Sequence, residues 1–413
     1  MHFSLSQCVK RVRVFRTALI TAGMLAALVA VSSLKAQDKV PDPIPAPTPR
    51  PTPFPPPVLT KANLSPELTP TAIVTAMRKV ADWQLARSEA SFKPDWTNGV
   101  LFTGFMAAST TTGDPKYYHA MLAMGEKFNW QLGKNPPHAD DQCVAQTYLE
   151  LYLQHPDPKM IETARKQFDE MLSKPKGGWP WSWCDALFMA PPSLARLYKI
   201  TGDTKYLDFM SREWWITSKK LYDEEAHLYF RDKTFFPTNI VKKTGKPALE
   251  ANGKKIFWSR GNGWVMGGLV RVLQFMPADY PDRPNFVKQF KEMAAALLAI
   301  QGSDGLWRSG LLDPDTYQQP ENSGSALFTY AFAWGINEGI LDRATYLPAV
   351  QKAWAGLVSH IYADGRLGSI QPVGMGPSLF KPTSSENFGV GAFLLVGSEL
   401  HRLARPQTKP VNK

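Results

Sequence analysis

Acidic side chains stand at the starts of apolar segments, where a protein can carry out proton chemistry. Asp185 lies in the stretch GGWPWSWCDALFMAPP after three tryptophans, and Asp140 and Asp141 open another apolar segment. A helix N-terminus stabilises a carboxylate anion, whereas burial beside aromatic rings favours the protonated form. A like-charged neighbour raises a carboxyl pKa further. Opposed influences of this kind produce carboxyl groups that can both give and take a proton near neutral pH.

The other reactive side chains form no recognisable site. The seven His are scattered, and the sequence contains neither an HExxH motif nor a Cys-x-x-Cys pair, the usual signatures of a metal centre. The glycines of RGNGW (260–264) lack the spacing of a phosphate-binding loop, and no nucleophile elbow is present. We therefore predict carboxylate chemistry with no metal and no cofactor.

The segments that position these carboxylates are helical by their periodicity. Apolar residues recur at spacings of three and four in segments 71–89, 115–133, 157–173 and 285–302. The motifs TGDPKY and TGDTKY, 89 residues apart, end one helix at Gly and begin the next at Asp. These amphipathic helices belong on the outside of a helical assembly.

Six further helices of different character alternate with the amphipathic ones. Each opens on a polar motif and then turns strongly apolar, in segments 96–108, 140–153, 183–198, 260–276, 321–336 and 386–400. Helices that are apolar on all sides are buried. About twelve alternating helices therefore predict an all-α toroid of two concentric rings, with the inner helices parallel.

Parallel inner helices would bring their polar N-termini together at one mouth. The residues gathered there would be Asn98, Asp140, Asp141, Asp185, Arg260, Asn262, Glu321, Asn322, Glu386 and Asn387. Such convergence from six segments favours a binding site, although each Asn or Asp taken alone could simply cap its helix. A loop and strand insertion near 220–258 is long enough to fold over this mouth. Pro191 and Pro192 should interrupt the Asp185 helix.

The N-terminus predicts export. A basic region precedes an apolar run at 17–31, so we interpret residues 1–37 as a secretory signal peptide, with an uncleaved anchor as the alternative. Residues 38–60 hold ten prolines between positions 41 and 57 and predict a polyproline II spacer. The catalytic domain would span 61–405, followed by a tail at 406–413, in a periplasmic or secreted protein with no membrane span after signal cleavage.

The charge balance argues against nucleic acid as a partner. Without residues 1–36 the chain has 42 Lys and Arg against 36 Asp and Glu, a mild excess. No basic run is interleaved with aromatic residues. We expect a monomer or weak dimer that binds a small anionic ligand.

At this point the chain resembles a known family, the unsaturated glucuronyl and rhamnogalacturonyl hydrolases of glycoside hydrolase families 88 and 105. The resemblance covers most of residues 75–403 and rests on the order and joint presence of several stretches. They are DWTNGV (95–100), TGDPKY (112–117), WCDALFMAPPSLARLYKITGDTKY (183–206), FWSRGNGWVMGGLVRVL (257–273), GSDGLWRSGLLDP (302–314), ENSGSALFTYAFAWGINEGIL (321–341) and NFGVGAFLLVGSEL (387–400). The resemblance implies an (α/α)6 toroid, in agreement with the helix count.

The resemblance also implies an unusual hydrolysis of lyase-generated oligosaccharides. An Asp donates a proton to C4 of the C4=C5 unsaturated uronyl residue at the non-reducing end and activates the water that adds at C5. By position in WCDALFM, Asp185 matches the family's catalytic Asp, and Asp140, or less well Asp141, matches the second one. Arg260 in WSRGNGW matches a feature suited to the substrate carboxylate, with a structural salt bridge as the alternative role.

Further candidate substrate-binding residues follow from the same stretches. Trp258 and Trp264 could face the sugar or pack in the core, and Trp183 and Asn262 lie beside the matched positions. Many members have a His in the loop before RGNGW, where this chain reads HLYFRD, so Arg231 or Asp232 takes that place. This departure from the family pattern bears on the substrate rather than on the reaction. A conventional inverting glycosidase, a non-catalytic polysaccharide-binding protein, and a lyase or epimerase stay as alternatives.

Cys143 and Cys184 are the cysteines left after signal removal. They lie at the starts of consecutive inner helices, so a disulfide in an oxidising compartment is one alternative. Two buried free thiols are the other, which the 8–10 Å spacing of packed helices favours.

Overall fold

The structure, a computed structural model, describes residues 58–173 and 180–405. The predicted signal peptide, most of the predicted spacer and the predicted tail lie outside these residues. Within them, no helix is both long and apolar enough to cross a lipid bilayer.

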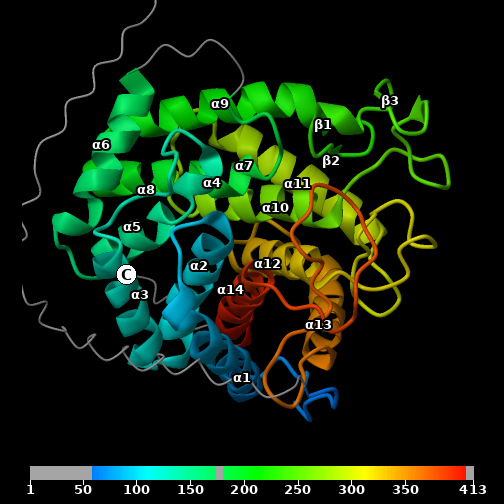
Figure 1. The fold of residues 1–413 in the computed structure, drawn as a ribbon, viewed down its shortest axis with the longest axis horizontal. Coiled ribbons are helices and arrows are strands. Elements are labelled where there is room, and N and C mark those ends of the chain that lie inside the picture. The colour runs from blue at the N-terminus through cyan, green and yellow to red at the C-terminus, as the bar shows by residue number, and fades with distance from the viewer. Residues whose placement is uncertain (1–57, 174–179, 406–413) are drawn as a thin grey trace, which may run out of the picture. The chain divides into compact units, whose positions relative to one another are not determined.

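The inner ring is built from six helical units that contact one another in sequence order (Figure 1). Two of the units are each broken into a short and a long piece. The ring closes where the last helix packs along the first. The inner helices are α2 (Trp96–Thr112), α4 (Ala139–Gln142) with α5 (Ala145–Gln154), α7 (Ala186–Met189) with α8 (Pro191–Thr201), α10 (Ser259–Leu273), α12 (Asn322–Asn337) and α14 (Asn387–Ala404).

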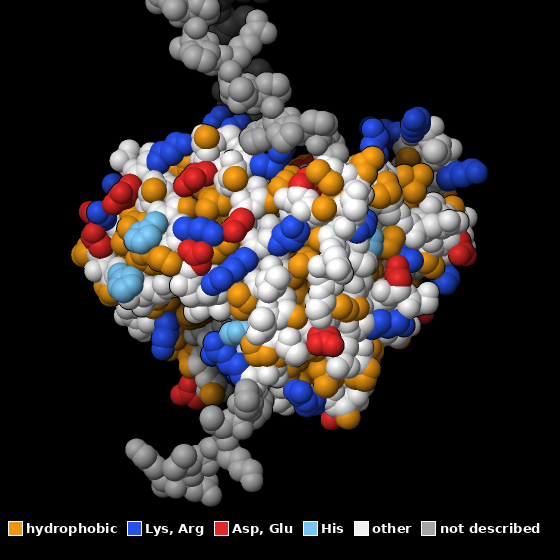
Figure 2. Space-filling view, turned by 90° about the horizontal axis from the view of Figure 1, so that it is seen from below, with side chains coloured by type: hydrophobic (Ala, Val, Ile, Leu, Met, Phe, Trp, Pro, Cys, Tyr) orange, Lys and Arg blue, Asp and Glu red, His pale blue; other side chains and the backbone are white. Residues whose placement is uncertain are grey.

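The outer helices are those that the sequence predicts to be amphipathic. Each packs against an inner neighbour in the chain and lies toward the periphery in Figure 1. They are α1 (Pro70–Ser88), α3 (Pro115–Lys127), α6 (Lys159–Ser173), α9 (Lys205–Leu221), α11 (Arg283–Ala299) and α13 (Arg343–Ser359), and a 3₁₀ turn, η1 (Glu89–Ser91), follows α1. On the face in Figure 2, positive and negative side chains are interspersed. The predicted all-α toroid of two concentric rings is confirmed.

Helix boundaries follow the local signals. Gly113 and Gly202 end α2 and α8 in left-handed conformation, with φ of 68° and 72°. Asp114 then caps α3 by accepting a hydrogen bond from the Lys116 amide. Pro191 begins α8 directly after α7, so the predicted interruption of the Asp185 helix is confirmed. The largest difference from the predicted boundaries is at α3, which ends at Lys127 rather than near 133.

The early end of α3 has a packing cause. Asn129 and Trp130 adopt positive φ, which turns the chain back so that the Trp130 ring lies over Gly125. Trp130 then packs edge to face on Tyr148, with ring centroids 5.3 Å apart. The tertiary contact outweighs the helical pattern of the sequence.

The insertion between α9 and α10 contains four short strands. They form two antiparallel pairs, with a 3₁₀ turn, η2 (Lys233–Phe235), between them. The strands are β1 (Tyr222–Asp223), β2 (Leu228–Tyr229), β3 (Ile240–Val241) and β4 (Lys246–Pro247). This agrees with the strand and loop insertion predicted near 220–258.

Both described cysteines are free and buried. Their thiols point to different neighbouring helices. A Cβ added to Gly99 of α2 would lie 3.0 Å from the Cys143 sulfur, whereas one added to Gly261 of α10 would lie 3.1 Å from the Cys184 sulfur. The free-thiol alternative therefore describes this structure.

Candidate active site

Asp140 and Asp185 come together where two broken inner helices begin. Asp140 lies in the short helix α4, and Asp185 directly precedes α7, which packs against α4. The Asp185 side chain is 12% exposed and that of Asp140 29%. The breaks in these helices allow two acidic side chains to approach from adjacent segments at the mouth of the ring.

Burial favours the protonated forms of both groups, and repulsion from neighbouring carboxylates adds to this effect at Asp140. Burial, followed by the charges of Asp185 and Asp141, raises the pKa of Asp140 to about 7. Burial also raises the pKa of Asp185, although the positive charge of Arg231 opposes this shift. These are the opposed influences that general acid–base catalysis requires.

Arg231 lies against Asp185. Its Nε is 3.4 Å from Asp185 Oδ2, while Nη1 donates to Asp232 at 2.6 Å. The backbone fixes this pairing, because the Cys184 amide donates to the Arg231 carbonyl at 2.8 Å. The insertion between α9 and α10 therefore places the Arg231 guanidinium beside the carboxylates of Asp185 and Asp232.

Asn262 holds the strand that leads to Arg231. Its Oδ1 accepts from the Tyr229 amide at 2.7 Å, and its Nδ2 donates to the Tyr229 carbonyl at 3.0 Å. Asn262 is fully buried. It thus joins α10 to β2 rather than presenting a surface to a ligand.

A cavity of about 660 Å³ opens beside these groups. Its lining combines positively charged, acidic and aromatic side chains. The residues that line it include His138, Asp140, Trp183, Arg231, Lys233 and Met375. The Trp183 ring stacks on His138 with centroids 4.8 Å apart. Such a mixed wall suits a polar ring compound with a negative charge.

The start of α10 is buried. Arg260 has no exposed surface, and its Nη1 and Nη2 donate to the carbonyls of Gln371 and Pro372 at 2.6 and 2.8 Å. Trp258 and Trp264 are 2% and 0% exposed. Substrate contacts were predicted for these three residues, but their side chains are buried in this structure. The structure therefore favours core packing for the two tryptophans and loop anchoring for Arg260.

Polar groups from the other inner helices also meet at the mouth, many of them as caps. Glu321 caps α12 through the amides of Ser323 and Gly324 and also accepts from the Gln371 amide at 3.1 Å. The Asn387 side chain of α14 donates to Asn98 of α2 at 3.3 Å. The inner helices therefore bring their polar N-termini together, as predicted. Some of these polar residues, such as Glu321, also cap their own helices, as the alternative predicted.

Sequence reasoning missed His138 and Gln371. Gln371 Oε1 accepts from Trp258 Nε1 and Ser309, and its Nε2 donates to the Gly376 carbonyl and Ser378. It therefore shapes the loop that places Met375 at the cavity. Gln371 lies in an aperiodic stretch with no sequence signal for this role, whereas His138 directly precedes the Asp140 segment and could have been considered.

Similarity to known proteins identifies the family of this chain. Residues 72–404 match the family described as Glycosyl Hydrolase Family 88. The chain belongs to this family, and it is a glycoside hydrolase. A relative from Formosa agariphila called "Unsaturated 3S-rhamnoglycuronyl hydrolase" is 41% identical over 81% of this chain and 92% of its own length. One of the same description from an Alteromonas species is 32% identical over 78% of this chain and 83% of its own.

Solved structures extend the comparison to the fold of this family 88 hydrolase. A glycosyl hydrolase of family 88 from Bacteroides vulgatus superposes with a TM-score of 0.74. It is 33% identical, and the match covers 81% of this chain and 99% of that one. The helical toroid is shared over nearly the whole of that protein.

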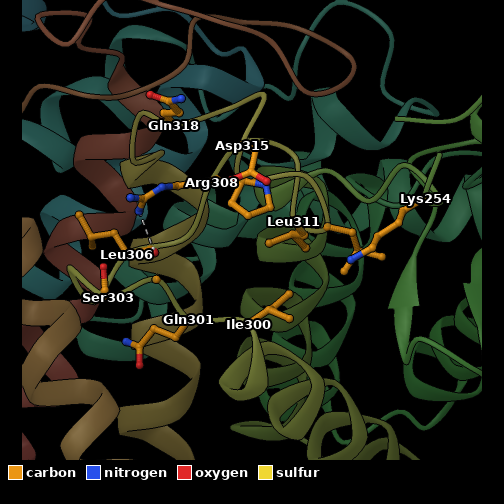
Figure 3. Close-up of a pocket in the computed structure, with 12 residues that line it drawn as sticks. Lys254, Ile300, Gln301, Ser303, Leu306, Arg308, Leu311, Asp315 and Gln318 are labelled. Carbon is orange, nitrogen blue, oxygen red and sulfur yellow. Dashed lines mark hydrogen bonds between the residues drawn. The ribbon is translucent and has the colours of Figure 1, made fainter. Parts of the chain in front are cut away.

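Figure 3 shows a second cavity, which neither Asp140 nor Asp185 lines. It has a volume of about 510 Å³ and shares no lining residue with the first. Lys254 lies across it from Arg308, which is held by Asp304 at 2.8 Å.

Within the described residues, no group of three or more His, Cys, Asp or Glu side chains is arranged to hold a metal ion.

Proposed function

We propose that this glycoside hydrolase hydrates the C4=C5 double bond of unsaturated uronyl residues at the non-reducing end of lyase-generated oligosaccharides. The observation that carries the proposal is the pair Asp140 and Asp185, whose pKa values burial raises, beside a cavity that Arg231 enters. The names of the two curated relatives support the same reaction class, with a rhamnose-containing uronide as the substrate.

The proposed chemistry uses one proton and one water. Asp185, protonated, donates to C4, and the resulting carboxylate takes a proton from the water that adds at C5. The hydrated product then opens to a keto sugar and releases the shortened saccharide. Asp140 supplies the second carboxyl, and its charge state follows that of Asp185 because the two groups interact.

Arg231 is the proposed partner of the substrate carboxylate. A guanidinium can bind a carboxylate through two parallel hydrogen bonds. Arg231 lines the cavity, whereas Arg260 is fully buried and donates to backbone carbonyls. Trp183, stacked on His138, offers an aromatic wall for the sugar ring.

The site of action that we propose is outside the cytoplasm. The basic and apolar segment at 1–37 supports export, and lyases that act on extracellular polysaccharides would supply the substrate there. Measuring the mass of the mature protein from the native host tests this part of the proposal. Recovery of the protein in the cytoplasmic fraction with residues 1–37 retained would contradict it, whereas retention in the membrane fraction would indicate the uncleaved anchor.

The test of the reaction is loss of the ultraviolet absorbance of the enol ether. The wild-type protein should remove this absorbance from unsaturated uronyl oligosaccharides and leave their saturated counterparts intact. Asp185→Asn should lower kcat by about 10²–10⁴-fold, the usual contribution of general acid–base catalysis. Its circular dichroism and melting temperature serve as the control for folding.

Two outcomes would overturn the proposal. Cleavage of saturated oligosaccharides at comparable rates would indicate a conventional inverting glycosidase. Binding without turnover in the wild-type protein would indicate a polysaccharide-binding protein.

A further inference from the structure

The hairpin formed by β3 and β4 carries unbalanced positive charge. Lys242, Lys243 and Lys246 lie at its tip and are exposed. Between Asp232 and Glu250 the chain has four lysines and no acidic residue. Among the ion pairs of the described residues, none involves the three lysines of the tip. Figure 2 shows Lys and Arg side chains gathered at the edge of the molecule on the side where Figure 1 places β3.

Backbone pairing joins the two strands of the hairpin. Ile240 pairs with Pro247 and Val241 with Lys246. Gly245, with φ of 66°, completes the turn, and its amide donates to the Val241 carbonyl at 2.8 Å. Lys242, Lys243 and Lys246 lie within five positions of one another, and like charges in such a short segment repel, so the arrangement favours a negatively charged partner.

The base of the hairpin is joined to the wall of the catalytic cavity. The Ala248 amide donates to the Asn239 carbonyl at 2.9 Å, and Asn239 Nδ2 donates to the Thr234 carbonyl at 2.7 Å. Thr234 and its neighbour Lys233 line the cavity beside Arg231. Positively charged side chains therefore lie both in the cavity wall, at Arg231 and Lys233, and at the tip of the hairpin that is joined to this wall.

We propose that the β3–β4 hairpin binds the part of an anionic oligosaccharide that extends beyond the sugar being hydrolysed. The inference rests on the proposed function, which places the non-reducing terminal uronyl residue in the cavity and directs the rest of the chain outward. Lysine ammonium groups act as point charges on flexible stems, so they accept carboxylate or sulfate groups at varied positions along a chain. The hairpin would thus select long, charged substrates without taking part in the chemistry.

The test compares substrate lengths in a charge-neutralised variant, Lys242→Gln/Lys243→Gln/Lys246→Gln. KM for an unsaturated uronyl hexasaccharide at low salt should rise about tenfold, since each of three exposed ion pairs contributes modestly. KM for the unsaturated disaccharide and kcat for both should stay unchanged. The matched control is Lys166→Gln/Lys199→Gln/Lys352→Gln, which removes three exposed charges from α6, α8 and α13 and should leave all values unchanged.

Salt provides a second readout. Raising the ionic strength should remove the wild-type preference for the hexasaccharide and have little effect on the hairpin variant. Equal loss of hexasaccharide affinity in the control variant, or no loss in the hairpin variant, would overturn the proposal. If the wild-type protein turns over neither substrate, the proposed function fails. Affinity electrophoresis of both variants in a uronic-acid polysaccharide gel then tests the hairpin by itself, and equal mobility shifts would refute it.

Discussion

Arg231 is the positively charged residue that acts on both proposed catalytic carboxyls, Asp140 and Asp185. It lowers the pKa values of Asp140 and Asp185, whereas burial raises them. Because the net direction for both is upward, protonated carboxyl groups persist to higher pH than in water. The same guanidinium is the proposed partner of the substrate carboxylate, so its two effects should be separable by experiment.

Replacement of Arg231 by Gln should change both binding and the pH profile. Loss of the cation removes the influence that lowers the two pKa values, so both should rise and the alkaline limb of kcat/KM should move to higher pH. KM should increase about ten- to hundredfold, the usual effect of losing a charge-assisted hydrogen bond. Steady-state kinetics across a pH series measures both changes.

The conservative variant Arg231→Lys separates the two roles. It retains the charge and should keep the alkaline limb near its wild-type position, while the loss of bidentate geometry should still raise KM. An unchanged KM in both variants would place the carboxylate partner elsewhere.

At the scale of elements, the insertion depends on α10 for its position. Asn262 binds the amide and carbonyl of Tyr229, and two residues later the chain reaches Arg231. A buried backbone group left without its partner costs about 1–3 kcal/mol. The segment that carries Arg231, the proposed partner of the substrate carboxylate, is therefore held by an amide side chain that lies outside the cavity.

Asn262→Ala should consequently weaken both folding and catalysis. We expect a loss of about 2–4 kcal/mol in unfolding free energy, since two buried backbone groups lose their partner. We also expect a lower kcat/KM and faster proteolysis within 222–258. Denaturant unfolding and limited proteolysis measure these changes, with Asn285→Ala on the surface of α11 as the control. Wild-type proteolysis with reduced stability would show that Asn262 supports the core without positioning the insertion.

The helices were predictable because their signals are local. The apolar periodicity, the Gly-Asp boundaries at 113–114 and the proline break at 191 are each encoded within a few residues. The loop after Ser369 was not predictable, because Gln371 is held by Trp258 and Ser309, more than 60 positions away. Long-range hydrogen bonds of this kind leave no periodic trace in the sequence.

The difference between local signals and long-range contacts also explains which residues of the candidate site could be predicted. Asp140 and Asp185 were identified because each opens an apolar helix. The burial of Arg260 was not foreseen, because it depends on the carbonyls of a loop 111 positions later. A motif shows which residue types are present, but the packing of distant segments decides which of them face the cavity.

At the scale of the whole molecule, the toroid depends on the seam between its first and last inner helices. Helices α2 and α14 approach backbone to backbone. A Cβ added to Gly391 would lie 2.3 Å from the Val100 carbonyl oxygen, and one added to Gly104 would lie 2.6 Å from the Gly391 Cα. The seam also joins Asn98 and Asn387 at the mouth, so ring closure and the shape of the site are linked.

Gly391→Val should therefore force the seam apart. No rotamer avoids a Cβ clash with backbone atoms, so α2 and α14 must separate, at a cost of about 1–3 kcal/mol or more. The midpoint of denaturant unfolding should fall, and kcat/KM should fall with it because the mouth changes shape. Ser398→Val, on the more exposed side of α14, is the matched control and should cost under about 1 kcal/mol, the range of helix propensity. Equal midpoints for the two variants would show that the seam tolerates separation and that the ring is held closed by its other contacts.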